Sequence, residues 1–226
     1  MDCWIKIEPF LKLDHVNGEL VFREVLFMLL NHDGVAEILI KSENLVEMLD
    51  YHGFERNLKF LYAKMIELFT PNDIKKVLSE KNYLRLSVMN WDINAVKFVW
   101  KIMEKNFTDE ETRGFISRKR DYYTQNLLFS TAQNAKSQEI CAFVWIKIKS
   151  LFKIEKLKFL LLERDSDGSN ALEKSVESKN IVSIKFFLKV YFRVLELKDF
   201  IDNVKNFYQW AVLKSLSIVE ITTNFL

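Results

Sequence analysis

The chain has 226 residues, of which 49% are hydrophobic, so it is long enough to bury a substantial core. Lys and Arg number 33 against 31 Asp and Glu, and this net charge of +2 excludes a global attraction to nucleic acid or to acidic membranes. Five Gly and two Pro are very few, which disfavours hairpin-rich folds and Gly-rich phosphate loops and makes helix the expected structure.

The ends and the cysteines indicate the expected compartment. The first residues lack the cationic and apolar regions of a signal peptide, and no stretch offers the roughly 18 apolar residues of a membrane span. Cys3 and Cys141 do not form the pattern of a disulfide framework, and both are expected to be reduced. We expect a soluble intracellular protein without membrane insertion, located in the cytoplasm or alternatively in the nucleus.

Five asparagine-led segments form an internal repeat. They begin at Asn44, Asn82, Asn126, Asn170 and Asn206. Two consecutive spacings are 44 residues (126 − 82 and 170 − 126), and the outer ones are 38 (82 − 44) and 36 (206 − 170). The Asn side chain can cap the first turn of a helix, so each segment predicts the start of an inner helix. Small residues five or six positions later, such as Ser87, Thr131 and Ser175, would allow a neighbouring helix to approach closely.

Two further helical segments follow each inner helix. The first is an apolar outer helix, represented by Val96–Trp100 and Ile184–Leu188, and the copy starting at Asn126 has one extra residue before it. Trp100 and Trp145 close such segments and are expected in the core between repeats. A short third helix is signalled by Thr70–Pro71 and by the capping-box pattern Thr108–Glu111.

These elements predict an all-α solenoid of about five units, each with two long helices and one short helix, and with few or no hairpin fingers. We expect one repeat domain over residues 1–226. Its predicted parts are a half-repeat cap at 1–43, repeats at 44–81, 82–125, 126–169 and 170–205, and a truncated repeat at 206–226. Because end repeats must cover their apolar faces, this truncation predicts exposed hydrophobic surface at the carboxyl-terminal edge.

Residues Asp167–Val176 (D-G-S-N-A-L-E-K-S-V) and Ser183–Leu188 (S-I-K-F-F-L) resemble the ankyrin repeat, whose pattern is D-x-x-G-x-T-P-L-H-x-A-A and then I-V-K-L-L-L. Gly168 and Leu172 match, while Asn170 replaces Thr. The 44-residue period is similar to the lengthened, divergent ankyrin arrays common in arthropod proteins. The resemblance covers residues 20–226 and implies protein binding through a concave inner-helix face and finger loops, with no enzymatic residues.

Partner-binding residues are expected where the copies differ, because the shared positions hold the stack together. The position three residues after each capping Asn carries Glu47, Arg85, Phe129, Glu173 and Gln209. We predict that these side chains form a mixed-charge, aromatic ladder that binds another protein. Trp91, at an inner-helix end where other copies carry Gly, Ala, Lys or Ser, is a further candidate anchor.

Two other kinds of scaffold are alternatives. An armadillo or HEAT solenoid has units of about 40 to 47 residues, and uniformly short helical links would favour it over an ankyrin array. A helical nucleic-acid binder could use Arg118, Lys119 and Arg120 on phosphates with Tyr122 and Tyr123 stacking on bases, although a solvated loop tip is the favoured interpretation of this cluster.

Chemical sites are expected to be absent. Asp165–Gly168 could begin a calcium loop, but it lacks the further ligands and the distal Glu, so a turn before a helix is favoured. His15, His32 and His52 could bind a metal together with Cys3, but their spacings match no metal-ligand pattern. Cys141 could act as a nucleophile, but its apolar neighbours favour a packed thiol. We therefore expect no metal, no cofactor and no enzymatic activity.

Overall fold

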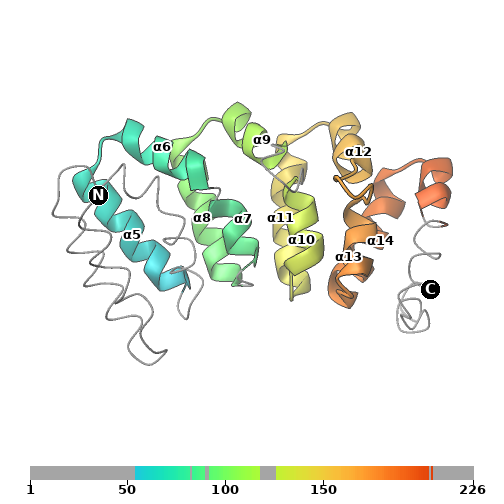
Figure 1. Cartoon of the computed structure of the whole chain (residues 1–226). Helices are drawn as coiled ribbons and strands as arrows, with labels where there is room; N and C mark the ends of the chain where they lie inside the picture. Colours follow the sequence, from blue (N-terminus) through green and yellow to red (C-terminus); the bar gives the residue numbers. More distant parts are fainter. Residues whose placement is uncertain (1–53, 82, 90–91, 118–125, 204, 206–226) are drawn as a thin grey trace, which may run out of the picture. The chain divides into compact units, whose positions relative to one another are not determined.

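A computed structural model describes residues 54–81, 83–89, 92–117, 126–203 and 205 (Figure 1). Throughout these residues the regular structure is helical and contains no strand, which confirms the all-α expectation. None of the helices in these ranges is long and apolar enough to cross a membrane. The chain divides into two compact units, Met1–Asn106 and Phe107–Leu226.

The first unit contains α5 (Phe54–Leu68), α6 (Pro71–Lys81), α7 (Tyr83–Met89) and α8 (Ile93–Asn106). The inner helix α7 packs along the outer helix α8, and α5 packs against α8 and α6. The short helix α6 starts where the sequence predicts, because Thr70 Oγ1 accepts a hydrogen bond from the amide of Asp73 at 3.3 Å. Trp100 is buried in this unit, as expected.

The second unit contains two described repeats and the short helix that precedes them. Its helices are α9 (Asp109–Ser117), α10 (Leu127–Asn134), α11 (Gln138–Leu151), α12 (Ile154–Leu162), α13 (Ala171–Glu177) and α14 (Ile181–Val194), followed by helical residues 197–203. The inner helices α10 and α13 begin 44 residues apart (171 − 127), and the outer helices α11 and α14 begin 43 apart (181 − 138). The outer helix of the earlier repeat thus begins one residue later, as predicted, but the extra residue lies in α10, because the connections at 135–137 and 178–180 are equally long.

The short third helices link one repeat to the next. The helix α12 packs against α11 of its own repeat and against α13 and α14 of the following repeat. The helix α9 precedes the repeat that contains α11 and packs against α11. Its capping box is formed as predicted, with the amide of Glu111 donating to Thr108 Oγ1 at 3.3 Å and the amide of Thr108 donating to Glu111 Oε2 at 2.9 Å.

Burial on both sides of the inner helices holds the second unit together. The small residues Thr131, Ala132 and Ser175 are buried, as the close approach of α10 and α13 requires. Leu128 and Leu172 are also buried, and each such side chain contributes about 1.5 to 3 kcal/mol relative to exposure. Trp145, by contrast, is only half-buried on α11, because the outer helices keep one face towards solvent.

Candidate partner-binding surface

The predicted ladder is only partly within the described residues. Glu47, Trp91, Gln209 and the basic patch Arg118, Lys119 and Arg120 lie outside them. Arg85 is half-buried on α7. Phe129 and Glu173 are both buried, at 0% and 1% exposure, so the prediction that they are presented to a partner is wrong for these two positions.

Burial of these positions follows from the inner helices themselves. In α10 every residue from Leu127 to Ala132 is buried, and in α13 every residue from Ala171 to Val176 is buried. An inner helix packed against neighbours in this way has no solvent face in its first two turns. In α10 and α13 the position three residues after the capping Asn therefore faces protein, whereas Arg85 at the same offset on α7 is only half-buried.

Glu173 is used for helix capping. Its side-chain Oε2 accepts from the amide of Asn170 at 2.8 Å, and its own amide donates to Asn170 Oδ1 at 2.9 Å. This reciprocal pair is a capping box, which satisfies two amides that the first turn of a helix leaves without intrahelical partners. Arg164 Nη1 lies 2.9 Å from Glu173 Oε2 and balances the buried carboxylate.

The capping asparagines have a second role that the sequence analysis missed. Asn126 and Asn170 cap their helices with Oδ1, as predicted. In addition, Asn126 Nδ2 donates to the carbonyl of Leu160 at 3.1 Å and to Glu163 Oε2 at 2.7 Å, and Asn170 Nδ2 donates to Asn203 Oδ1 at 2.8 Å. The signal was the choice of Asn in all five copies, because Asp would cap as well but has no donor, and Ser or Thr would offer only a shorter hydroxyl in place of the amide.

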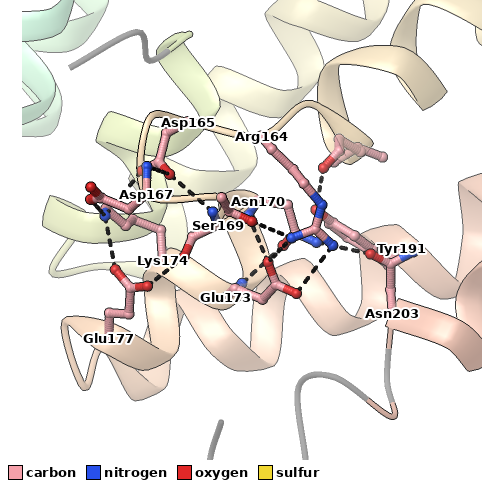
Figure 2. Close-up of polar contacts among 12 residues, drawn as sticks. Arg164, Asp165, Asp167, Ser169, Asn170, Glu173, Lys174, Glu177, Tyr191 and Asn203 are labelled. Carbon is pink, nitrogen blue, oxygen red and sulfur yellow. Dashed lines mark hydrogen bonds and ion pairs between the residues drawn. The ribbon is translucent and has the colours of Figure 1, made fainter. Parts of the chain in front are cut away.

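The connection between α12 and α13 is a tight loop rather than a strand hairpin (Figure 2). The amide of Asp165 donates to the carbonyl of Ser169 at 2.9 Å, and the amide of Gly168 donates to the carbonyl of Asp165 at 3.1 Å. Gly168 has φ of 79°, in the left-handed region where a side chain would be strained. The predicted turn before a helix is confirmed. We call residues 163–169 the inner loop.

The buried side chains of Asp165 and Lys174 hold the inner loop in place. The Asp165 carboxylate accepts from the amides of Asp167 and Ser169, each at 3.0 Å. Lys174 Nζ lies 3.0 Å from Asp165, 3.2 Å from Asp167 and 2.8 Å from Glu177 (Figure 2). Burial alone would lower the pKa of Lys174, but hydrogen bonds to the three carboxylates outweigh burial and raise it. A protonated Lys174 is therefore paired with the carboxylates of Asp165, Asp167 and Glu177.

The tip of the inner loop remains exposed. Ser166, Asp167 and Gly168 are exposed, and Arg164 is 47% exposed while its guanidinium donates to the Gly168 carbonyl and to Glu173. The loop backbone is thus fixed by buried groups, and its tip presents polar side chains to solvent. Within the part of the chain that the structure describes, no three His, Cys, Asp or Glu side chains are grouped so that they could hold a metal ion.

Cys141 packs as an apolar side chain. It is buried on α11, and its Sγ lies 3.7 Å from Ser183 Oγ. Burial raises the pKa of the thiol to about 11, although the contact with Ser183 acts in the opposite direction. The thiol is therefore protonated at neutral pH, and reactive cysteines instead have lowered pKa values and solvent access.

Three further side chains form hydrogen bonds between these two repeats. Asn180 Nδ2 donates to the carbonyl of Ala135 at 2.8 Å, and Ser183 Oγ donates to the carbonyl of Thr131 at 3.3 Å. The hydroxyl of Tyr191 donates to the carbonyl of Leu161. In each case a side chain of the later repeat is hydrogen-bonded to the main chain of the earlier one.

Comparison with known proteins gives no relative: no protein-family model, curated protein or solved structure matches this chain.

Proposed function

We propose that the chain is a non-enzymatic protein-interaction module built of ankyrin-like repeats, and that it binds its partner through the inner loop. The proposal keeps the scaffold suggested by the sequence but moves the contact surface. The buried first turns of α10 and α13 leave the exposed loop tip, rather than the predicted ladder, as the contact surface next to the inner helices.

The anchoring of the inner loop is the observation that carries this proposal. Asp165, Lys174 and Glu173 hold its backbone from the buried side, while Ser166 and Asp167 face solvent. A loop already fixed in one conformation loses little entropy when it binds, so its contacts contribute more fully to affinity. Functional loops on a rigid repeat scaffold commonly have this arrangement.

The test is affinity capture from the native cell with the full chain and two variants of equal charge. Ser166→Arg places a long cationic side chain at the loop tip, where the Ser166 side chain is exposed. Ala63→Arg adds the same charge at an exposed position of α5 in the first unit. Thermal unfolding of both variants should match the unmodified chain, which shows that differences in capture come from the surface.

We expect the unmodified chain and Ala63→Arg to capture the same protein, and Ser166→Arg to lose it. Equal capture by Ser166→Arg would remove the loop from the contact. If the unmodified chain enriches no protein over an unrelated helical bait, the proposed function itself fails.

A further inference from the structure

Positive charge is concentrated on the outer helices of the second unit. The helices α11 and α14, which pack against each other, contain five Lys or Arg and one Glu, a net charge of +4 (5 − 1). The whole chain carries +2, so the rest of the chain carries −2 (2 − 4). The five cations are Lys147, Lys149, Lys185, Lys189 and Arg193. We call the solvent-facing residues of α11 and α14 the outer-helix face.

The carboxylates nearest in sequence do not cancel this charge. Glu139 lies in the first turn of α11, ten residues (149 − 139) and about 15 Å along the helix from Lys149. The helix α14 has no Asp or Glu, and Glu196 beyond its end is paired with Lys158 at 2.9 Å. With the adjoining segments included, residues 138–162 and 181–203 contain nine Lys or Arg and five Asp or Glu, which is still +4 (9 − 5). The excess therefore belongs to the whole region.

The cations of α14 form a row that reaches solvent. Lys185, Lys189 and Arg193 follow one another at intervals of four residues, so they lie about 6 Å apart along one side of the helix. Lys189 and Arg193 are exposed, as is Lys149 on α11, and none of these three forms an ion pair within the part of the chain that the structure describes. Like charges four residues apart weaken a helix. An anionic partner would remove this repulsion.

Apolar side chains project from the same two helices. Ile146 is 64% exposed on α11 and Phe192 is 61% exposed on α14, beside Arg193. Trp145 and Phe186 are half-buried on these helices. Cations mixed with aliphatic and aromatic side chains, Trp included, are typical of surfaces at the boundary between lipid headgroups and acyl chains.

We propose that the outer-helix face binds the surface of a membrane that contains anionic lipids. Its Lys and Arg side chains would pair with headgroup phosphates, while Ile146 and Phe192 would enter the boundary with the acyl chains. A single-stranded nucleic acid fits less well, because Ile146 cannot stack on a base and four of the five cations are Lys rather than the fork-shaped Arg. The outer-helix face shares no residue with the inner loop, so membrane contact would add to the proposed function without depending on it.

The test is co-sedimentation of the full chain with vesicles of phosphatidylserine and phosphatidylcholine. Vesicles of phosphatidylcholine alone are the control for charge, and the chain should bind only the anionic vesicles. Binding should fall as the salt concentration rises from about 0.1 M to 1 M, because the Debye length shortens from about 10 Å to 3 Å.

Two variants test the face, each with a matched control in the first unit. Lys189→Glu reverses a charge in the middle of the row, and Lys76→Glu makes the same change at an exposed position of α6. We expect Lys189→Glu to weaken binding at least about tenfold and Lys76→Glu less than about twofold. Ile146→Gln should weaken binding about threefold, whereas Ile66→Gln, at an exposed Ile of α5, should leave it unchanged. Thermal unfolding of the four variants should match that of the unmodified chain.

The membrane proposal fails if the chain binds neither kind of vesicle or binds both equally. It also fails if Lys189→Glu or Ile146→Gln binds the anionic vesicles as well as the unmodified chain does. A single-stranded oligonucleotide or polyglutamate that binds more tightly than the vesicles would assign the face to a nucleic acid or to an acidic protein segment instead. Either of these results would overturn the membrane contact and leave the inner loop untouched.

Discussion

The two repeats that begin at Asn126 and Asn170 use the same cap but fill the third position after it differently. In the later repeat Glu173 closes a capping box, and in the earlier repeat Phe129 occupies the same offset. Both side chains are buried, although one is charged and the other is apolar. The comparison shows that packing of these two inner helices determines the burial of this position. A buried side chain there can either cap the helix, as Glu173 does, or make apolar contacts, as Phe129 does.

The largest expected effect is at the apolar member of this pair. Phe129→Ala removes a fully buried ring and should lower the free energy of unfolding by about 3 to 5 kcal/mol. Phe159→Ala, which removes an exposed ring, should cost less than about 1 kcal/mol. Urea unfolding of both variants measures the difference. Similar losses in the two would mean that Phe129 does not belong to the core.

A smaller difference is expected between the two capping residues. Asn126→Asp keeps the capping oxygen but replaces a donor 2.7 Å from the Glu163 carboxylate with a second carboxylate, which should cost about 2 to 3 kcal/mol at neutral pH. In Asn170→Asp, the new carboxylate lies next to the amide of Asn203, which can rotate to donate to it but then loses its bond to the Asp199 carbonyl, so a loss of about 1 kcal/mol is expected. Urea unfolding at pH 7 measures the two free energies. Equal losses of unfolding free energy in the two variants would show that the Nδ2 contacts do not contribute to the difference in stability.

Changes at Glu173 separate its capping role from its charge. Glu173→Gln can still accept from the Asn170 amide, and it loses only the ion pair with the half-exposed Arg164, so about 1 kcal/mol or less is expected. Glu173→Ala loses both interactions and should cost roughly 2 kcal/mol. Thermal unfolding compares the two variants. A Gln variant as unstable as the Ala variant would assign the effect to charge.

The smallest expected effect is a change in pH dependence at Cys141. Because burial raises the thiol pKa to about 11 in the folded chain, the folded state keeps a proton that the unfolded thiol loses above about 8.5. This contribution to stability is complete below about pH 8.5 and is lost as the pH rises towards 11. In Cys141→Ala, the decline in unfolding free energy from pH 8.5 to 11 should be shallower. A decline of the same steepness would contradict the raised pKa.

Local features of the fold could be predicted from the sequence. Capping at Thr108, Asn126 and Asn170 depends on residues within one helical turn. The 44-residue spacing between repeats can be read from the sequence. The extra residue before α11 was equally visible. These predictions succeeded because each depends on groups close together in the chain.

The contact surface could not be predicted in the same way. Variation between Phe129 and Glu173 looked like variation at a binding face, but two buried positions can also differ when different neighbours cover them. The second contact of Asn126 joins residues 34 apart, so it depends on how repeats stack rather than on local pattern. The hydrogen bond from Tyr191 to the Leu161 carbonyl likewise depends on the packing of α14 against α12.

The cross-repeat hydrogen bonds have a consequence for sequence divergence. Asn180, Ser183 and Tyr191 each donate to a main-chain carbonyl, and every residue type carries that acceptor. Substitutions at Ala135, Thr131 or Leu161 therefore leave the acceptor atom in place. A duplicated unit can drift far from its original sequence and still dock onto the unit before it, provided that its own few donors and its helix lengths persist.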